Sequence, residues 1–139
     1  MRMNVARIVD SLGLKGRKSL RTYNDLEDLI ESGRMTPSAV DHLAGVLDIG
    51  VEELMSRASY YKAKERRRLS APQALRLERS ARLYGEAEEL FGSPDAARRF
   101  MQTPHPELGG RSPLQRAATE LGAREVEELL GRIEYGLPV

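Results

Sequence analysis

The sequence predicts an all-α protein. Apolar residues recur at intervals of three and four along most of the 139 residues, and no stretch alternates apolar and polar residues long enough to suggest a strand. Hydroxyl–proline pairs stand just before three of the apolar runs. The hydroxyl accepts from an unpaired backbone N–H, and proline suits the first helical turn, so each pair predicts a helix start. The pairs are Thr36-Pro37, Ser93-Pro94 and Ser112-Pro113.

The expected helices follow in order from these starts. A short helix carries Leu26, Leu29 and Ile30 and closes at Gly33. Residues 1–23 match no known pattern, and their role is left open. Helical segments are expected over 36–48, 51–55, 71–91, 94–101, 113–121 and 123–135, with a basic stretch over 56–70 and a loop over 103–111.

Two capping boxes and one apolar stripe support the later helices. Gln73 and Gln115 each stand three residues after a serine, the spacing at which a side chain returns to the helix cap. The last helix has an apolar stripe at i, i+3, i+4 and i+7. Its opposite face is predicted to be solvated surface; this face holds Arg124, Glu125, Glu127, Glu128 and Arg132.

The charge distribution divides the chain. Residues 1–69 contain 13 basic and 10 acidic side chains, whereas residues 70–139 contain 9 basic and 11 acidic ones. A chain of this length forms one ordinary domain or two small ones. We expect a boundary at this point, with domains over 1–69 and 70–139, and any contact with a polyanion in the first of them.

Composition argues against several kinds of chemistry. The chain has no cysteine, so disulfides, thiolate metal sites and a cysteine nucleophile are excluded, and its two histidines are far apart. The sequence offers no arrangement typical of catalytic residues, of a metal site or of a cofactor site, which predicts that the protein is not an enzyme. No signal peptide and no run of about 18 apolar residues is present, so a cytoplasmic protein without a membrane segment is expected.

A basic helix is expected after the turn at residues 49–50. The stretch 56–70 holds six basic residues against one acid, Glu65, and follows two shorter helical segments, which is the order of a helix-turn-helix with a basic recognition helix. The alternative is a solvated linker. Tyr60 and Tyr61 are expected to split, with one packing inward and the other exposed. The candidate DNA-binding residues are Arg57, Ser59, Tyr60, Lys62, Lys64, Arg66 and Arg67.

The last residues predict a stiff, apolar helix end. Gly136 is expected to be left-handed, Leu137 to pack back on the last turn, and Pro138 to stop the helix. In a second reading, compatible with the first, Pro138 also lowers the entropy cost of docking this end into a partner. The carboxylate of Val139 would then face cationic groups of that partner.

The loop before the 113–121 helix is a second candidate contact. Gly109 and Gly110 permit positive φ and close approach of another chain, and Arg111 offers a planar fork for a carboxylate or phosphate. The alternative is a structural turn in which Arg111 binds Glu125 or Glu128. Ser112 is better explained as a helix cap than as a nucleophile.

Three motifs carry a resemblance to a known family. In order, they are FGSPDAARRFM, PELGGRSPL and LGAREVEELLGRIEYG, and all three lie in the second half of the chain. From about Leu69 onward the sequence resembles the toxin-binding domain of Xre/MbcA/ParS antitoxins, the partners of RES-domain toxins. Phe100-Met101 stands where family members often have Trp-Leu, and the basic stretch is less typical of the family than the motifs are.

The resemblance implies a function and a set of contact residues. The implied protein is a non-enzymatic antitoxin of a type II toxin–antitoxin system, which binds a RES-domain toxin acting on NAD and covers its active site. An Xre-like helix-turn-helix lobe would bind promoter DNA as a homodimer, within a larger complex with the toxin, and repress the operon. The alternative is a stand-alone transcription regulator whose C-terminal lobe dimerises or senses a ligand. The expected toxin-binding residues are Leu108, Gly109, Gly110, Arg111, Arg132, Tyr135, Gly136, Leu137, Pro138 and Val139.

Overall fold

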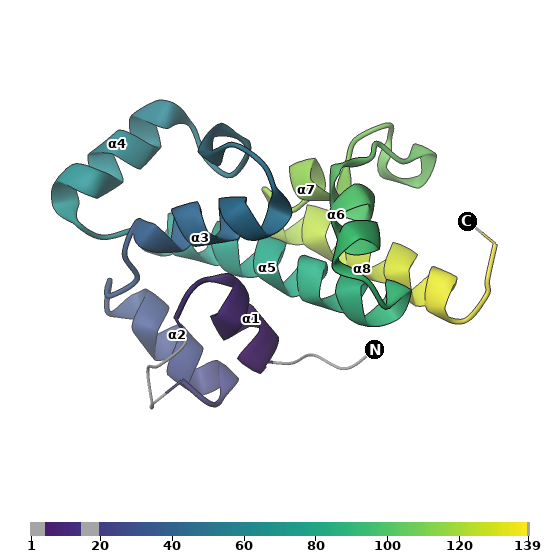
Figure 1. Ribbon diagram of the computed structural model, residues 1–139, viewed down its shortest axis with the longest axis horizontal. Helices are drawn as coiled ribbons and strands as arrows, with labels where there is room; N and C mark the ends of the chain where they lie inside the picture. The colour runs from purple at the N-terminus through teal and green to yellow at the C-terminus, as the bar shows by residue number, and fades with distance from the viewer. Residues whose placement is uncertain (1–4, 15–19, 139) are drawn as a thin grey trace.

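Helices form the fold throughout residues 5–14 and 20–138, the part of the chain described by this computed structural model (Figure 1). Within these ranges there is no strand, and a single isolated antiparallel bridge joins His105 to Arg111. The all-α prediction is confirmed. The elements are α1 (Val5–Ser11), α2 (Tyr23–Glu31), α3 (Ser38–Leu47), η1 (Val51–Glu53), α4 (Arg57–Arg66), α5 (Ala71–Phe91), α6 (Pro94–Gln102), η2 (Pro106–Leu108), α7 (Pro113–Arg116) and α8 (Glu120–Glu134).

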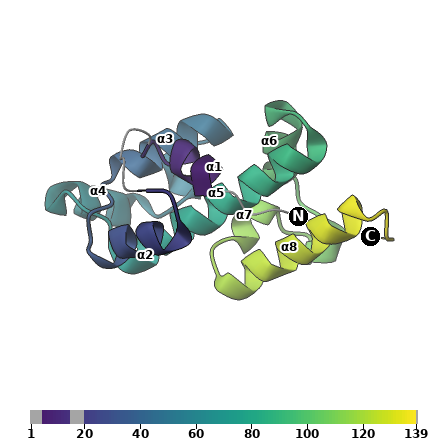
Figure 2. The same ribbon diagram turned by 90° about the horizontal axis from the view of Figure 1, so that it is seen from below.

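Helix α5 is the longest element and lies at the centre of the fold. Its 21 residues start at the predicted capping box, in which Ser70 Oγ accepts from the Gln73 N–H and Gln73 Oε1 accepts from the Ser70 N–H. It ends at Gly92, which has a left-handed φ of 74°. Helices α1, α2 and α3 contact α5, and so do α6 and α8 (Figure 2). Both halves of the chain are therefore built on the same helix.

One apolar core joins the two halves. It includes Ile8 of α1, Leu77 of α5 and Leu129 of α8, none of which is more than 2% exposed. The division into domains over 1–69 and 70–139 stays a prediction, and its boundary falls at the start of the helix that both halves share.

The first helix was not predicted from the sequence. An apolar stripe at i, i+3, i+4 and i+7 was the signal for it; these residues are Val5, Ile8, Val9 and Leu12, all buried. Arg7 fixes α1 on α5 through an ion pair, with Nη1 2.5 Å from Glu88 Oε1. Tyr84 donates from its hydroxyl to the other oxygen of Glu88 at 3.1 Å.

Two of the three hydroxyl–proline helix starts are confirmed and the third is wrong in detail. Ser93 accepts from the Ala96 N–H at the start of α6, and Ser112 accepts from the Gln115 N–H at the start of α7. Thr36 instead places its hydroxyl 2.7 Å from the Ser38 hydroxyl, and α3 begins at Ser38 without a side-chain cap. The difference arises because Pro37 already has helical angles and occupies the cap position itself.

The break between α7 and α8 falls earlier than predicted. Helices were expected over 113–121 and 123–135, but α7 ends at Arg116 and α8 begins at Glu120. Arg79 of α5 explains the early end, because its guanidinium donates at 2.9 Å to the carbonyl oxygens of both Ala117 and Ala118. These bonds satisfy backbone acceptors at the end of α7 from another helix.

Helix α8 begins soon after the end of α7 because Thr119 caps it. The Thr119 hydroxyl accepts from the Gly122 N–H at 3.0 Å. The chain turns so tightly here that a Cβ on Gly122 would lie 1.9 Å from the Arg116 carbonyl oxygen. The short connection between α7 and α8 therefore requires glycine at this position.

Charged side chains are buried between α5 and α8. Arg82 Nη1 lies 2.8 Å from Glu78 Oε1, and Arg82 Nε lies 3.6 Å from Glu127 Oε2. The prediction that Glu127 belongs to a solvated face is wrong, since its side chain is only 29% exposed. The sequence pattern placed Glu127 opposite the apolar stripe, but Arg82 gives it a partner against α5.

Glu86 is the most unusual member of this group. Its side chain is buried, and its Oε2 has no hydrogen-bond partner within the described ranges. Burial, followed by interaction with the nearby Glu127 carboxylate, raises the pKa of Glu86 to about 8. Glu86 therefore stays protonated in the folded protein at pH values where it is ionised in the unfolded chain.

We expect this proton to make stability depend on pH. Between about pH 5 and 8 the folded protein holds a proton that the unfolded chain has lost, so the free energy of unfolding should fall as pH rises, by at most about 1.4 kcal/mol per pH unit. Glu86→Gln is neutral at every pH and should remove this slope, leaving the variant more stable than the native protein at pH 8. Urea unfolding at pH 6 and pH 8 measures the difference.

The control for this experiment is Glu89→Gln, which changes the same charge on the exposed side of α5. It should keep the native slope. Equal slopes for Glu86→Gln and the native protein would show that Glu86 does not retain its proton on folding.

Candidate functional site

The loop between α6 and α7 is closed by backbone hydrogen bonds. His105 donates from its backbone N–H to the Arg111 carbonyl at 3.0 Å, and Gly110 donates to the His105 carbonyl at 3.1 Å. The His105 ring accepts from the Glu107 N–H through Nδ1 at 3.0 Å. Gly109 and Gly110 have φ values of 66° and 78°, which confirms the prediction of positive φ. The loop thus presents a fixed, exposed turn.

Arg111 extends from this turn into solvent. Its side chain forms neither a hydrogen bond nor an ion pair with any residue in the two described ranges. The alternative in which Arg111 binds Glu125 or Glu128 of the last helix is therefore wrong, and Glu125 Oε1 instead lies 2.8 Å from Arg116 Nε. Leu108, by contrast, is only 2% exposed and supports the turn from within.

The end of α8 has the predicted left-handed cap. Gly136 has a φ of 68° and donates to the Ile133 carbonyl at 3.1 Å, while Leu137 donates to the Arg132 carbonyl at 2.8 Å. This pair of bonds is a Schellman motif. Leu137 does not pack back completely, because 53% of it is exposed, and 73% of Tyr135 is exposed. Two large side chains therefore lie in solvent on a rigid helix end.

An ion pair brings the loop and the end of α8 together. Arg132 Nη1 lies 3.4 Å from Glu107 Oε2. The two residues are 25 positions apart, so no local sequence signal predicts this pair, and Glu107 was not predicted as part of the site. We name the combined region the C-terminal surface; it consists of Gly109, Gly110, Arg111, Arg132 and residues 135–138. Val139, also predicted to bind the partner, lies outside the described residues.

Helix α4 carries the basic stretch, and one tyrosine fixes its position. Tyr60 is buried and donates from its hydroxyl to Asp41 Oδ1 at 2.5 Å, linking α4 to α3. The hydrogen bond to Asp41, followed by burial, raises the pKa of Tyr60 to about 12. Tyr61 is 59% exposed, which confirms that the two tyrosines split. Tyr60 therefore faces inward, and its neighbour Tyr61 is the tyrosine exposed to solvent.

The other predicted DNA-binding residues remain near the surface of α4. Lys64 Nζ lies 5.1 Å from the centre of the Tyr60 ring, which is a cation–π contact. Ser59 is half-buried and bonds to the capping residue Ser56. Arg67 ends the helix in a left-handed conformation, with a φ of 59°. The remaining members are exposed; they are Arg57, Lys62 and Arg66.

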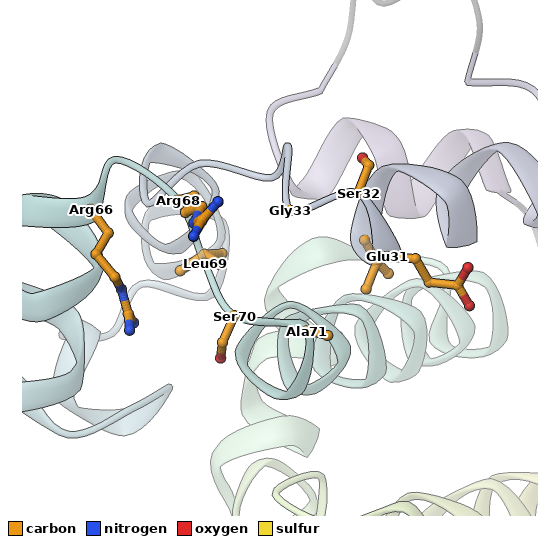
Figure 3. A pocket seen from close by; sticks show the side chains of 9 residues that line it. Glu31, Ser32, Gly33, Arg66, Arg68, Leu69, Ser70 and Ala71 are labelled. Atoms are coloured by element: carbon orange, nitrogen blue, oxygen red, sulfur yellow. The ribbon is translucent and has the colours of Figure 1, made fainter.

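A groove of about 300 Å³ lies beside the end of α4 (Figure 3). It is bounded by the end of α2, the end of α4 and the first turn of α5. Arg66 and Arg68 line it on the α4 side, and Glu31 lines it on the α2 side. The groove therefore carries two basic side chains and one acidic side chain.

Residues 5–14 and 20–138 contain no group of three acids or histidines placed to hold a metal ion. In the same part of the chain, each helix is too short or too polar to cross a lipid bilayer.

These features define a helical protein with two surfaces suited to binding, one basic and one built from a rigid loop and helix end. Residues 86–136 match the family model of the antitoxin Xre/MbcA/ParS C-terminal toxin-binding domain. The matched segment includes every described residue of the C-terminal surface except Leu137 and Pro138. Over residues 86–136 the chain is therefore of the Xre/MbcA/ParS antitoxin type, as its sequence motifs predicted.

Individual relatives agree with this assignment. An antitoxin Xre of Pseudomonas putida is 32% identical over 111 residues, which are 80% of this chain and 64% of that protein. An antitoxin Xre of Yersinia enterocolitica is 39% identical and one of Photorhabdus laumondii 37% identical, each over 71 residues. These matches cover 50% of this chain and 48% of each relative. The chain thus spans between about half and two thirds of the length of the relatives that it matches.

Proposed function

We propose that this protein is the antitoxin of a type II toxin–antitoxin system and that it inhibits a RES-domain, NAD-consuming toxin by covering the toxin's active site. The observation that carries the proposal is the position of the C-terminal surface, most of which lies inside the matched toxin-binding domain. The RES class of the partner rests on the resemblance of the three sequence motifs to antitoxins of that group.

The C-terminal surface has the properties of a tight protein contact. Tyr135 and Leu137 offer large exposed side chains, and tyrosines often carry much of the binding energy at interfaces. The Schellman motif and Pro138 restrict the conformation of the C-terminal end of α8, so binding through it costs little conformational entropy. Arg111, without an ion pair in the described chain, is available for a carboxylate or phosphate-binding site on the partner.

In this proposal the protein acts by occupying space and performs no reaction. Beside the loop, the Ser112 hydroxyl serves as a helix cap, since it accepts the Gln115 N–H. The same chain is proposed to bind its own promoter as a homodimer through α4 and to repress the operon. Support for DNA binding comes from the exposed basic side chains of α4.

Co-expression tests the proposal directly. The RES-domain protein encoded beside this chain should co-purify with it, and NAD loss caused by that protein should stop at equal concentrations. A RES-domain protein that elutes separately and stays fully active would favour the stand-alone regulator. Affinity for promoter DNA that falls steeply with salt would support the repressor role.

A further inference from the structure

We propose that α4 reads DNA sequence in the major groove with an outward ridge formed by Ala58, Lys62 and Glu65, joined by Tyr61. This inference rests on the proposed DNA binding and deepens it. It assigns base recognition to residues that differ, apart from Lys62, from those expected from the sequence.

The rotation of α4 is fixed by what it buries. Tyr60 and Ala63 are its buried residues, and Tyr60 is held by its hydrogen bond to Asp41. Successive residues turn by about 100° around a helix axis. The side opposite the buried pair is therefore occupied by Ala58 and Glu65, with Tyr61 and Lys62 about 50° to either side. All four of these residues are exposed.

Each edge of this ridge carries at least one basic residue. Arg57 and Lys64, seven positions apart, lie along one edge, and Ser59 and Arg66, also seven apart, lie along the other. A helix in the major groove has a phosphate backbone on each side. A less basic centre between edges that carry basic residues matches this arrangement. A surface that bound any polyanion regardless of sequence would gain nothing from an acid, Glu65, at its centre.

The position of α4 leaves the ridge accessible. Its main packing partner is the short η1 turn, and Figures 1 and 2 both show it at the end of the molecule opposite the C-terminus. The major groove of DNA admits a helix, whereas that of double-stranded RNA is too narrow for side chains to read. Duplex DNA is therefore the partner that fits the ridge.

The side chains of the ridge determine what it would recognise. Glu65 can accept only from a base amino group, of which cytosine N4 is the usual partner, and Lys62 can donate to guanine O6 and N7. Ala58 is suited to the methyl group of thymine. Base contacts specify sequence while phosphate contacts set affinity, so changes on the ridge and on its edges should have different effects.

The test is selection from a library of random duplex DNA by the full chain, followed by affinity measurements over a range of salt concentrations. Glu65→Gln keeps the shape of the side chain but favours adenine. The sites that it selects should carry adenine in place of cytosine at one position of each half-site. Its preference for cytosine there should fall by about 5- to 100-fold, while the salt dependence of binding stays unchanged. Arg66→Ala should instead weaken binding to all sequences and lower the salt slope by about one.

The matched control is Glu27→Gln, an exposed acid on α2 that should select the native site. An unchanged preference in Glu65→Gln would overturn the readout by this ridge. Binding by the native chain that is sensitive to salt but indifferent to sequence would also overturn it and make α4 a general polyanion surface. Absence of any binding at low salt would instead refute the DNA-binding part of the proposed function.

Discussion

Gly122→Ala should lower the free energy of unfolding by about 3 kcal/mol, a large part of the stability of an ordinary domain. The added Cβ would lie 1.9 Å from the carbonyl oxygen of Arg116 and 2.8 Å from its carbonyl carbon. Both atoms belong to the backbone, so no side-chain rotation relieves the clash. The start of α8 would have to move, which disrupts the Thr119 cap. Urea and thermal unfolding followed by circular dichroism measure the change, and the Tm should fall by about 10 °C.

Gly131→Ala is the matched control, because it makes the same change in the same helix. A Cβ at Gly131 meets no atom within 4 Å. Alanine there should stabilise the protein by about 0.5 to 1 kcal/mol, because it reduces the freedom of the unfolded chain. If Gly122→Ala unfolded at the same urea concentration as the native protein, the close contact between α7 and α8 would not exist in solution.

The second large effect is expected at the C-terminal surface. The double substitution Tyr135→Ala and Leu137→Ala should raise the concentration needed to inhibit the toxin at least about 30-fold, since interface residues of this kind often contribute 2 kcal/mol or more. Both side chains are more than half exposed, so folding should be unaffected. The assay measures NAD loss caused by the proposed RES-domain toxin at rising concentrations of each variant, and the two inhibitory concentrations give the ratio.

Leu121→Ala is the control for this substitution. Leu121 is 75% exposed and lies at the other end of α8, where it should not affect inhibition. Full inhibition by the double variant at native concentrations would move the contact away from the end of α8. The loop at Arg111 would then be the remaining candidate.

Local signals made much of the fold predictable. Capping boxes and left-handed glycines act within a few residues, so the limits of α5 and the cap at Gly136 could be predicted closely. The break after α7 could not, because it depends on Arg79, which lies 38 positions before its partner Ala117. The half-buried position of Glu127 could not be predicted either, because it depends on the ion pair with Arg82 in a distant part of the chain.

The candidate site shows the same limit. The composition of the loop and of the helix end indicated exposed contact segments, but their union through Glu107 and Arg132 depends on the packing of α8 against the loop. On α4, the basic composition was plain in the sequence. The inward direction of Tyr60 was not, because it requires Asp41 of α3 as a partner. Prediction of which tyrosine faces outward needed the assembled fold.

Helix α5 and its neighbours hold the basic helix and the C-terminal surface at opposite ends of the molecule (Figure 1). Neither bound partner would then cover the binding surface of the other. Under the proposed function, toxin and promoter DNA would bind to separate surfaces, and inhibition and repression would be compatible within a single complex.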